Sequence, residues 1–262
     1  MNTQIPCAKN LYSFKVGCPS YVYPADILPN VHKLASSMDA VEIVLFESSQ
    51  PENLPPEETV EELAVIGDEQ DLSYVIHLPL DCRLGDPDPE ERDYAVRTFQ
   101  TFIQRTALLK PESYIIHFDP AGREQNSEAW EQRLRDGMDS ICSNSDVSPR
   151  TFAVEMLDYP FEETEEIVED LNLSVCFEVG HLLLAGRCLE QYYLDFRDRV
   201  SVIHLHGINS GKAHVPPDVL GESYQNTVAG ILSGFTGIVV LEVFSPEYLK
   251  RSIEFIQRIF HD

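Results

Sequence analysis

Eight short apolar runs alternate with eight longer amphipathic segments along this chain, and the alternation restricts its fold more than any other feature. Such continuously apolar runs are typical of parallel strands that helices cover. The predicted strands lie near residues 14–18, 40–46, 72–78, 112–118, 150–156, 173–179, 199–206 and 236–243. The predicted helices lie near residues 26–37, 56–69, 89–108, 126–142, 161–171, 181–198, 222–233 and 246–260. Eight such units predict one α/β domain over residues 1–262, a single (β/α)8 TIM barrel, with a doubly wound sheet as the alternative.

Six of the apolar runs end in a histidine or an acidic residue. These are His77, His117, Glu155, Glu178, His204 and Glu242. Such side chains need a partner at the end of a buried strand, and the C-terminal ends of all barrel strands open onto one mouth. A mixture of imidazoles and carboxylates suits Zn²⁺, Mn²⁺ or Fe²⁺ and argues against an all-oxygen Ca²⁺ site. We therefore expect a metal site at the C-terminal mouth, bordered by the irregular stretches 79–88, 119–127 and 207–221 that follow strands.

The charge balance restricts the class of partner. The chain has 19 Lys and Arg against 44 Asp and Glu, which gives a formal net charge of −25. A field of this sign repels nucleic acid and anionic membranes, so we expect a small-molecule substrate. Six scattered cysteines without a C-x-x-C pair favour reduced thiols and a cytoplasmic location. We see no signal peptide and no apolar run long enough to span a membrane.

Short phrases along nearly the whole chain resemble the xylose-isomerase-like barrel superfamily, on the branch (AP endonuclease family 2) that holds apurinic endonuclease type IV. The phrases are VIHLPL at His77, YIIHFDP at His117, FAVEM at Glu155, SVCFEVGHLLLAG at Glu178 and His181, IHLHG at His204, KAHV at His214 and LEVFSP at Glu242. The resemblance implies that these eight named residues are metal ligands. It also implies a bridging role for Glu155.

Three positions depart from the pattern of that family. Glu178 stands where the family usually has Asp, which lengthens the arm of the ligand. Lys212 stands where the family has an acid two residues before His214, so a third metal bound by His181, His214 and that acid is not expected. Lys212 contacts a substrate phosphate or is a solvated loop residue. His206 stands where the family often has Asn, and we interpret it as a substrate-contacting residue.

The phrases GCPSYVYPADILPNVHKLA, DAVEIVLFE, HLPLD and VIHLHG most resemble the cobamide-remodelling phosphodiesterases. This implies metal-dependent hydrolysis of the nucleotide-loop phosphodiester of adenosylcobalamin-like cobamides, giving a cobinamide phosphate and an α-riboside. Two ions, Zn²⁺ or Mn²⁺, would activate water and bind the attacking and leaving oxygens. Glu155, Glu178 and Glu242 are the expected catalytic carboxylates. Phe14, Tyr21 and Tyr23 are candidates to pack on the corrin or the lower-ligand base, or are plain packing residues.

Two other functions fit the same residues. A sugar isomerase or epimerase would use one metal, with Glu155 and Glu242 as the two facing acids. Coordination of a second metal by His77 and His117 would favour hydrolysis over this reading. A non-catalytic metal- or corrinoid-binding protein is the remaining alternative.

Overall fold

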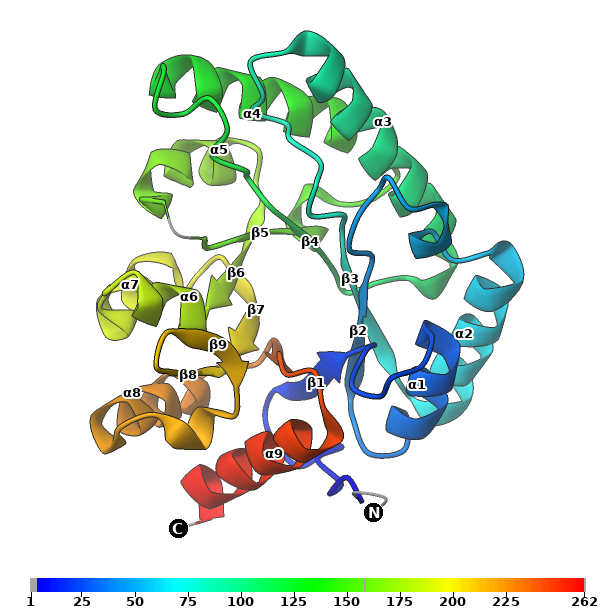
Figure 1. Cartoon of the computed structure of the whole chain (residues 1–262), viewed down its shortest axis with the longest axis vertical. Coiled ribbons are helices and arrows are strands. Elements are labelled where there is room, and N and C mark those ends of the chain that lie inside the picture. Colours follow the sequence, from blue (N-terminus) through cyan, green and yellow to red (C-terminus); the bar gives the residue numbers. More distant parts are fainter. Residues whose placement is uncertain (1–3, 158, 262) are drawn as a thin grey trace.

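The computed structural model describes residues 4–157 and 159–261, and eight parallel strands form a closed barrel (Figure 1). Neighbouring strands follow the order β1-β10-β7-β6-β5-β4-β3-β2 around the barrel. The strands are β1 (Lys15–Pro19), β2 (Ala40–Val44), β3 (Ser73–His77), β4 (Ser113–Ile116), β5 (Phe152–Glu155), β6 (Ser174–Glu178), β7 (Val200–Leu205) and β10 (Ile238–Leu241). Each lies within a predicted run or differs from it by one residue, so the predicted TIM barrel is confirmed.

Helices surround the barrel on its outside, as predicted (Figure 1). They are α1 (Ile27–Leu34), α2 (Glu57–Gln70), α3 (Pro89–Thr106), α4 (Ser127–Ser143), α5 (Glu165–Asp170), α6 (Val179–Leu184), α7 (Leu189–Phe196), α8 (Glu222–Ser233) and α9 (Pro246–His261). The single helix predicted over 181–198 is wrong. It divides into α6 and α7 because Gly186 adopts a left-handed φ of 68°, which ends α6.

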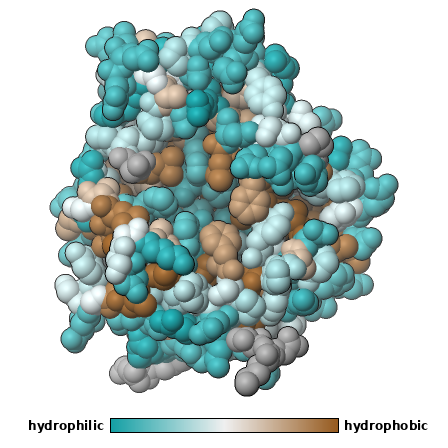
Figure 2. Space-filling view, viewed as in Figure 1, coloured by the Kyte–Doolittle hydropathy of each residue, from teal (hydrophilic) through white to brown (hydrophobic). Residues whose placement is uncertain are grey.

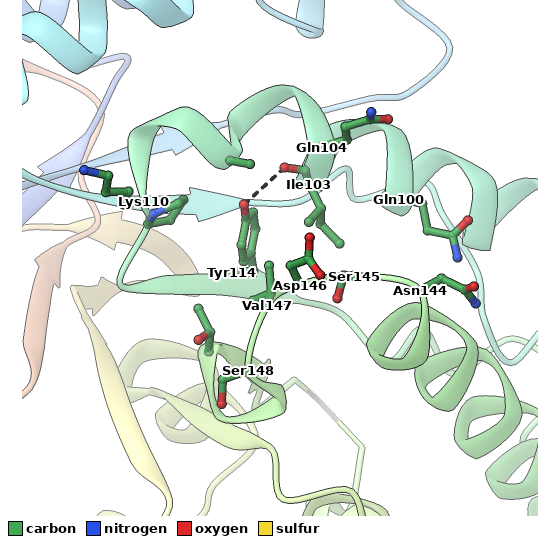
Figure 3. Close-up of a pocket in the computed structure, with 13 residues that line it drawn as sticks. Gln100, Ile103, Gln104, Lys110, Tyr114, Asn144, Ser145, Asp146, Val147 and Ser148 are labelled. Atoms are coloured by element: carbon green, nitrogen blue, oxygen red, sulfur yellow. Dashed lines mark hydrogen bonds between the residues drawn. The ribbon is translucent and has the colours of Figure 1, made fainter.

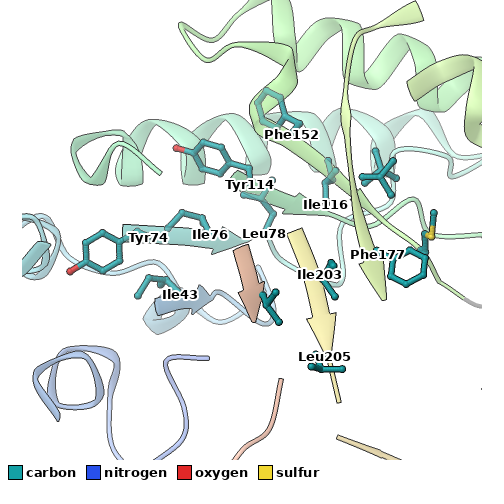
Figure 4. Close-up of a cluster of buried hydrophobic side chains, with 14 of the residues drawn as sticks. Ile43, Tyr74, Ile76, Leu78, Tyr114, Ile116, Phe152, Phe177, Ile203 and Leu205 are labelled. Atoms are coloured by element: carbon teal, nitrogen blue, oxygen red, sulfur yellow. The ribbon is translucent and has the colours of Figure 1, made fainter. Parts of the chain in front are cut away.

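The two faces of each strand carry different kinds of core. Outward-facing side chains such as Tyr74, Ile76 and Ile116 pack against the helices (Figure 4). Inward-facing side chains fill the barrel, namely Ala40, Val75, Ile115, Ala153, Cys176, Val202, Ile238 and Val240. Strand side chains alternate between faces, so the residue two positions after an inward one also faces inward. Those following residues are Glu42, His77, His117, Glu155, Glu178, His204 and Glu242, so strand geometry aims them at one region.

One addition to the barrel lies in the stretch 207–221. An antiparallel hairpin forms there from β8 (Gly207–Asn209) and β9 (Lys212–Val215), and a 3₁₀ turn follows at Pro217–Val219. Both hairpin strands contact α6. Sequence patterns predicted only an irregular loop here. The hairpin holds His214 in place beside the end of β7.

The opposite end of the barrel has a cavity of about 750 Å³, lined by Ile103, Lys110, Tyr114, Asn144 and neighbouring residues (Figure 3). It lies where β4 and β5 begin, away from the C-terminal mouth. The Tyr114 hydroxyl donates a hydrogen bond to the Ile103 carbonyl across its wall. The residues that line this cavity do not include any of the predicted metal ligands. The cavity lies at the N-terminal end of the barrel, the end that contributes to stability in this fold. Within the described ranges, no helix combines the length and apolar character that a membrane crossing requires.

Candidate metal centre

Glu155 belongs to two groups of donor atoms in the polar cluster at the C-terminal mouth. Its Oε2 atom lies 3.1 Å from Nε2 of His77 and 2.5 Å from Nε2 of His117. Its Oε1 atom lies 3.4 Å from Nδ1 of His204, which belongs to a second set of donors. The carboxylate is only 3% exposed. The two oxygens of Glu155 therefore face two different sets of donors.

A second set of donors surrounds Nδ1 of His204. Glu178 Oε2 lies 3.0 Å from this nitrogen, and Glu242 Oε2 lies 3.7 Å from it. Glu178 and His204 are fully buried, whereas Glu242 is 9% exposed. The strand register explains the proximity, because Glu178 on β6 pairs directly with His204 on β7.

Four groups of donors bring their ligand atoms within 4.8 Å of one another. They are His77–His117–Glu155, Glu155–Glu178–His204, Glu178–His206–Glu242 and His181–His206–His214. Consecutive groups share Glu155, Glu178 and His206. All eight sequence-predicted ligands fall within these groups, and His206 joins them.

Unpaired buried atoms indicate that this centre fits a cation. Among the described residues, eight buried side-chain nitrogen or oxygen atoms lack a well-aligned hydrogen bond, and four of them are Glu178 Oε2, His204 Nδ1, His206 Nε2 and Glu242 Oε2. Two ion-pair contacts still join these atoms to the carboxylate of Glu178, at 3.0 Å from His204 Nδ1 and 2.8 Å from His206 Nε2. Buried polar atoms are normally paired, because an unpaired one costs about 1–3 kcal/mol. All four belong to the donor groups, and their chemistry suits a divalent transition metal. The residues present therefore fit a bound metal ion.

Burial and neighbouring charges shift the protonation of these ligands in opposite directions. Burial lowers the pKa of His77, but the hydrogen bond to Glu155 and the charges of Glu155 and Glu42 together outweigh burial and raise the pKa to about 9. Burial likewise lowers the pKa of His206, but the charge of Glu178, the hydrogen bond to Glu178 and the charge of Glu242 together raise that pKa to about 9. Burial raises the pKa of Glu155, but the charges and hydrogen bonds of His117 and His204 together outweigh burial and hold that pKa well below its usual range. Protons on the histidines thus balance the buried carboxylates and compete with a cation for the same nitrogens.

Glu42 is a functional residue that sequence reasoning missed. It lies on β2, fully buried, and its Oε2 accepts a hydrogen bond of 2.9 Å from Nε2 of His204. This contact leaves Nδ1 of His204 facing the centre, as carboxylates do when they orient metal-binding histidines. The available signal was an acid in the middle of the apolar run AVEIV, two residues after the inward-facing Ala40.

His206 lies among the donors and not at a surface where substrate would arrive. It is fully buried, and its Nε2 lies 2.8 Å from Glu178 Oε1. Its ring centroid lies 4.3 Å from that of His214 and 5.9 Å from that of His181. The expectation of a purely substrate-contacting role overlooked this position, because the structure of the hairpin was not predicted.

The aromatic candidates occupy three different environments. Phe14 directly precedes β1, at the N-terminal end of the barrel, where its side chain is 3% exposed and stacks on Tyr12. It does not reach the C-terminal mouth, so the expected substrate contact of Phe14 is wrong and its role is packing. Tyr21 follows β1 and packs against Phe46 at a centroid distance of 4.8 Å. Tyr23 also follows β1, and the Lys33 ammonium lies 4.5 Å from its ring.

Lys212 begins β9 and is exposed. It pairs with Asn209 across the hairpin. Contact of Lys212 with a substrate phosphate stays a prediction.

The profile of the family described as xylose isomerase-like TIM barrel matches residues 32–259. The chain belongs to this family. The match covers seven of the eight strands and every residue of the candidate centre, so the superfamily resemblance seen in the sequence is confirmed.

Named relatives in sequence and structure are similar to this chain. Probable endonuclease 4 of Acholeplasma laidlawii is 26% identical in an alignment of 130 residues that covers 44% of this chain and 43% of that relative, less than half the length of either. A D-tagatose 3-epimerase-like protein superposes with a TM-score of 0.79 at 17% identity, covering 95% of this chain and 97% of the other. The IOLI protein, solved with a zinc atom, superposes with a TM-score of 0.69 at 16% identity, covering 94% and 96%. These two structures share the fold.

Proposed function

We propose that this protein is a metal-dependent phosphodiesterase that hydrolyses the nucleotide-loop phosphodiester of cobamides. The observation that carries the proposal is the position of Glu155, whose two oxygens face separate donor groups. An epimerase with a single metal has no need of the group formed by His77 and His117. Two ions held by these groups would activate water and stabilise both the attacking and the leaving oxygen in displacement at phosphorus.

The protein's own residues have distinct tasks in this reaction. His77, His117 and Glu155 form one ligand group, while Glu178, His204 and Glu242 extend the second. Glu242 is the most exposed of the three catalytic carboxylates, so it is the one best placed to orient the attacking water from the mouth. The water oxygen bonds to phosphorus as water gives up a proton, the bond from phosphorus to the ribose oxygen breaks, and the ribose oxygen takes up one proton in exchange.

The surroundings of the centre favour a neutral-to-apolar organic substrate over DNA. Exposed apolar side chains on the loops and short helices at this end include Leu80, Leu184, Val219 and Phe244. Seen in the direction of Figure 1, apolar side chains gather around the middle of this face, while hydrophilic ones cover most of the periphery (Figure 2). A net charge of −25 opposes a DNA polyanion. A corrinoid offers one phosphodiester within a large, partly apolar molecule.

The test incubates protein loaded with Zn²⁺ or, separately, Mn²⁺ with adenosylcobalamin, followed by chromatography and mass spectrometry. We expect a cobinamide phosphate and an α-riboside from the wild-type protein and from His32→Ala, a substitution of an exposed histidine on α1. We expect neither product from His117→Ala. Unchanged adenosylcobalamin with protein of verified metal content would exclude the proposed substrate.

One observation favours a second candidate, a sugar isomerase or epimerase. Glu155 Oε1 and Glu242 Oε2 both lie near Nδ1 of His204, at 3.4 and 3.7 Å, so two acids are close to one candidate ligand. Such acids exchange protons with a bound sugar in this class of reaction. Isomerisation of ketoses by the same metal-loaded protein, retained in His117→Ala, would support this candidate over hydrolysis.

A further inference from the structure

We propose that Arg83 selects a substrate that carries a phosphate group, by donating hydrogen bonds to a phosphate oxygen at the C-terminal mouth. The proposal rests on the phosphodiesterase activity proposed above and adds to it the side chain that recognises the anion. A net charge of −25 repels an anionic substrate, so this chain needs a local cation where the phosphate binds. Two loops that follow strands carry arginines, Arg83 in the stretch 79–88 and Arg123 in the stretch 119–127.

Arg83 lies where the loops after β3 and β4 meet. The loop after β3 begins beyond His77, and the Nε atom of Arg83 in this loop lies 3.7 Å from Oδ1 of Asp119. Asp119 lies in the loop after β4, close behind His117 in the sequence. Because β3 and β4 are neighbouring parallel strands, both loops lie at the same end of the barrel. The guanidinium is therefore on the side of the mouth where His77 and His117 end their strands.

The backbone that carries Arg83 is held in place while its side chain faces solvent. Cys82 and Leu84, on either side, are buried, whereas the Arg83 side chain is 52% exposed. The Arg83 carbonyl also accepts a hydrogen bond of 3.3 Å from the backbone N–H of Asp86. A ligand that binds Arg83 does not have to order this loop first, which lowers the entropic cost of binding.

Helix α4 supports both of the loops that meet at Arg83. Trp130 on α4 is fully buried, and its Nε1 donates a hydrogen bond of 2.9 Å to the Asp119 carbonyl. Gly85 lies so close to the same indole that a Cβ atom there would be 2.4 Å from Nε1. Arg133, also on α4, donates from Nε to the Gly85 carbonyl at 2.8 Å. The position of Arg83 relative to Asp119 is therefore set by contacts with one helix.

The two arginines differ in how much of the guanidinium is already paired. Nε of Arg123 donates to Oε2 of Glu163 at 2.6 Å, and Nη2 pairs with the other oxygen of the same carboxylate. Within the described residues, Arg83 has one ion pair, the 3.7 Å contact with Asp119, whose Oδ1 also accepts the N–H of Ala121 at 2.9 Å. Arg83 thus keeps N–H donors free for a ligand. A planar guanidinium matches the oxygens of a phosphate.

This assignment separates the two candidate functions. A neutral sugar offers Arg83 no anion, whereas a phosphodiester carries one negative charge. One unpaired guanidinium in a strongly acidic protein also suits a single phosphate group better than a polyanion. The geometry around Arg83 therefore favours hydrolysis of a phosphate ester over isomerisation of a neutral sugar.

Titration calorimetry with inorganic phosphate tests this inference on the zinc-loaded protein. The variants are Arg83→Ala, Arg83→Lys and the control Arg97→Ala, which removes an exposed arginine of α3. We expect Arg83→Ala to bind phosphate about tenfold more weakly or worse, since hydrogen bonds to charged groups are the strong ones. Arg83→Lys should lie between, because Lys keeps the charge without the planar fork. Arg97→Ala should bind as the wild type does.

Elemental analysis of zinc and circular dichroism accompany the titrations, and we expect all variants to retain zinc and to fold. Three results would overturn the inference. They are no measurable phosphate binding to the wild-type protein, equal affinities in wild type and Arg83→Ala, or loss of zinc from Arg83→Ala, which would assign Arg83 to upholding the metal centre.

The phosphate measurement does not depend on the identity of the substrate. Phosphate binding that requires Arg83, together with unchanged adenosylcobalamin, would exclude the cobamide and leave Arg83 as the residue that selects another phosphate ester. Hydrolysis of adenosylcobalamin with an unaltered phosphate affinity in Arg83→Ala would overturn the role of Arg83 and leave the proposed function standing.

Discussion

The two halves of the candidate centre are built in different ways. His77, His117 and Glu155 lie on or directly after strands, so strand spacing and register set their positions. His181, His206 and His214 depend on a short helix, a strand end and a hairpin whose backbone includes a left-handed histidine. The positions of the first three residues, which we call the strand-borne half, follow from the geometry of the barrel alone. The loop-borne half, formed by His181, His206 and His214, requires particular local geometry.

Glu155→Gln should have the largest effect, because it removes the charge that links the strand-borne group to the rest of the centre. We expect hydrolysis to fall by about 10³-fold or more, corresponding to about 4 kcal/mol of lost transition-state stabilisation. Steady-state kinetics and metal analysis measure the loss, with Glu61→Gln on the exposed face of α2 as the control. Hydrolysis at the wild-type rate in Glu155→Gln would show that the carboxylate bridges nothing.

Substitution of Glu42 should weaken metal binding through His204 without removing a ligand. Loss of an orienting partner typically costs 10- to 100-fold in metal affinity. We expect about 100-fold for Glu42→Ala and about tenfold for Glu42→Gln, since Gln retains an acceptor for Nε2 of His204. Zinc titration calorimetry separates these values. Equal losses in the two variants would point to a packing role.

The stability of the metal-free protein should decrease as the pH rises from about 6.5 to 9. The pKa values of His77 and His206 are raised to about 9 in the folded state, against 6.5 for an ordinary histidine. The folded protein therefore retains protons that the unfolded chain releases, and the stabilisation present below pH 6.5 is lost as the pH passes 9. We expect Tm to fall by several degrees over this range.

Thermal unfolding in a chelating buffer measures this effect, with zinc-loaded protein as the comparison. Zinc replaces the protons, so the loaded protein should lose less stability or become more stable with rising pH. His77 belongs to the strand-borne half and His206 to the loop-borne half. The decrease of Tm with pH in metal-free His206→Asn, compared with that of the wild-type protein, therefore reports how much each half contributes to the pH dependence of stability. A pH-independent Tm for the metal-free protein would contradict the raised pKa values.

Lys212→Ala should have the smallest effect. Lys212 is exposed on the hairpin, and a solvent-screened charge typically contributes about 1 kcal/mol or less. If Lys212 meets a substrate phosphate, KM should rise a few-fold while kcat is nearly unchanged. Lys250→Ala on α9 is the matched control. An unaltered KM would identify Lys212 as a solvated loop residue.

Much of the strand-borne half could be predicted because alternation is a local property. An inward residue such as Ala153 implies that Glu155 faces the same way, and this follows from sequence spacing alone. Glu42 obeyed the same rule and was missed because it lies within its run and not at the end. Phe14 was misplaced because aromatic character alone does not distinguish the two ends of a barrel.

The sequence by itself determined the barrel and the residues at the strand ends, since both follow from short-range patterns of apolar and polar residues. The tertiary structure decided that the two oxygens of Glu155 face two different groups of donors. It also decided that Gly180 gives His206 its space. These outcomes depend on ångström-scale contacts between residues distant in the sequence, which spacing along the chain does not encode.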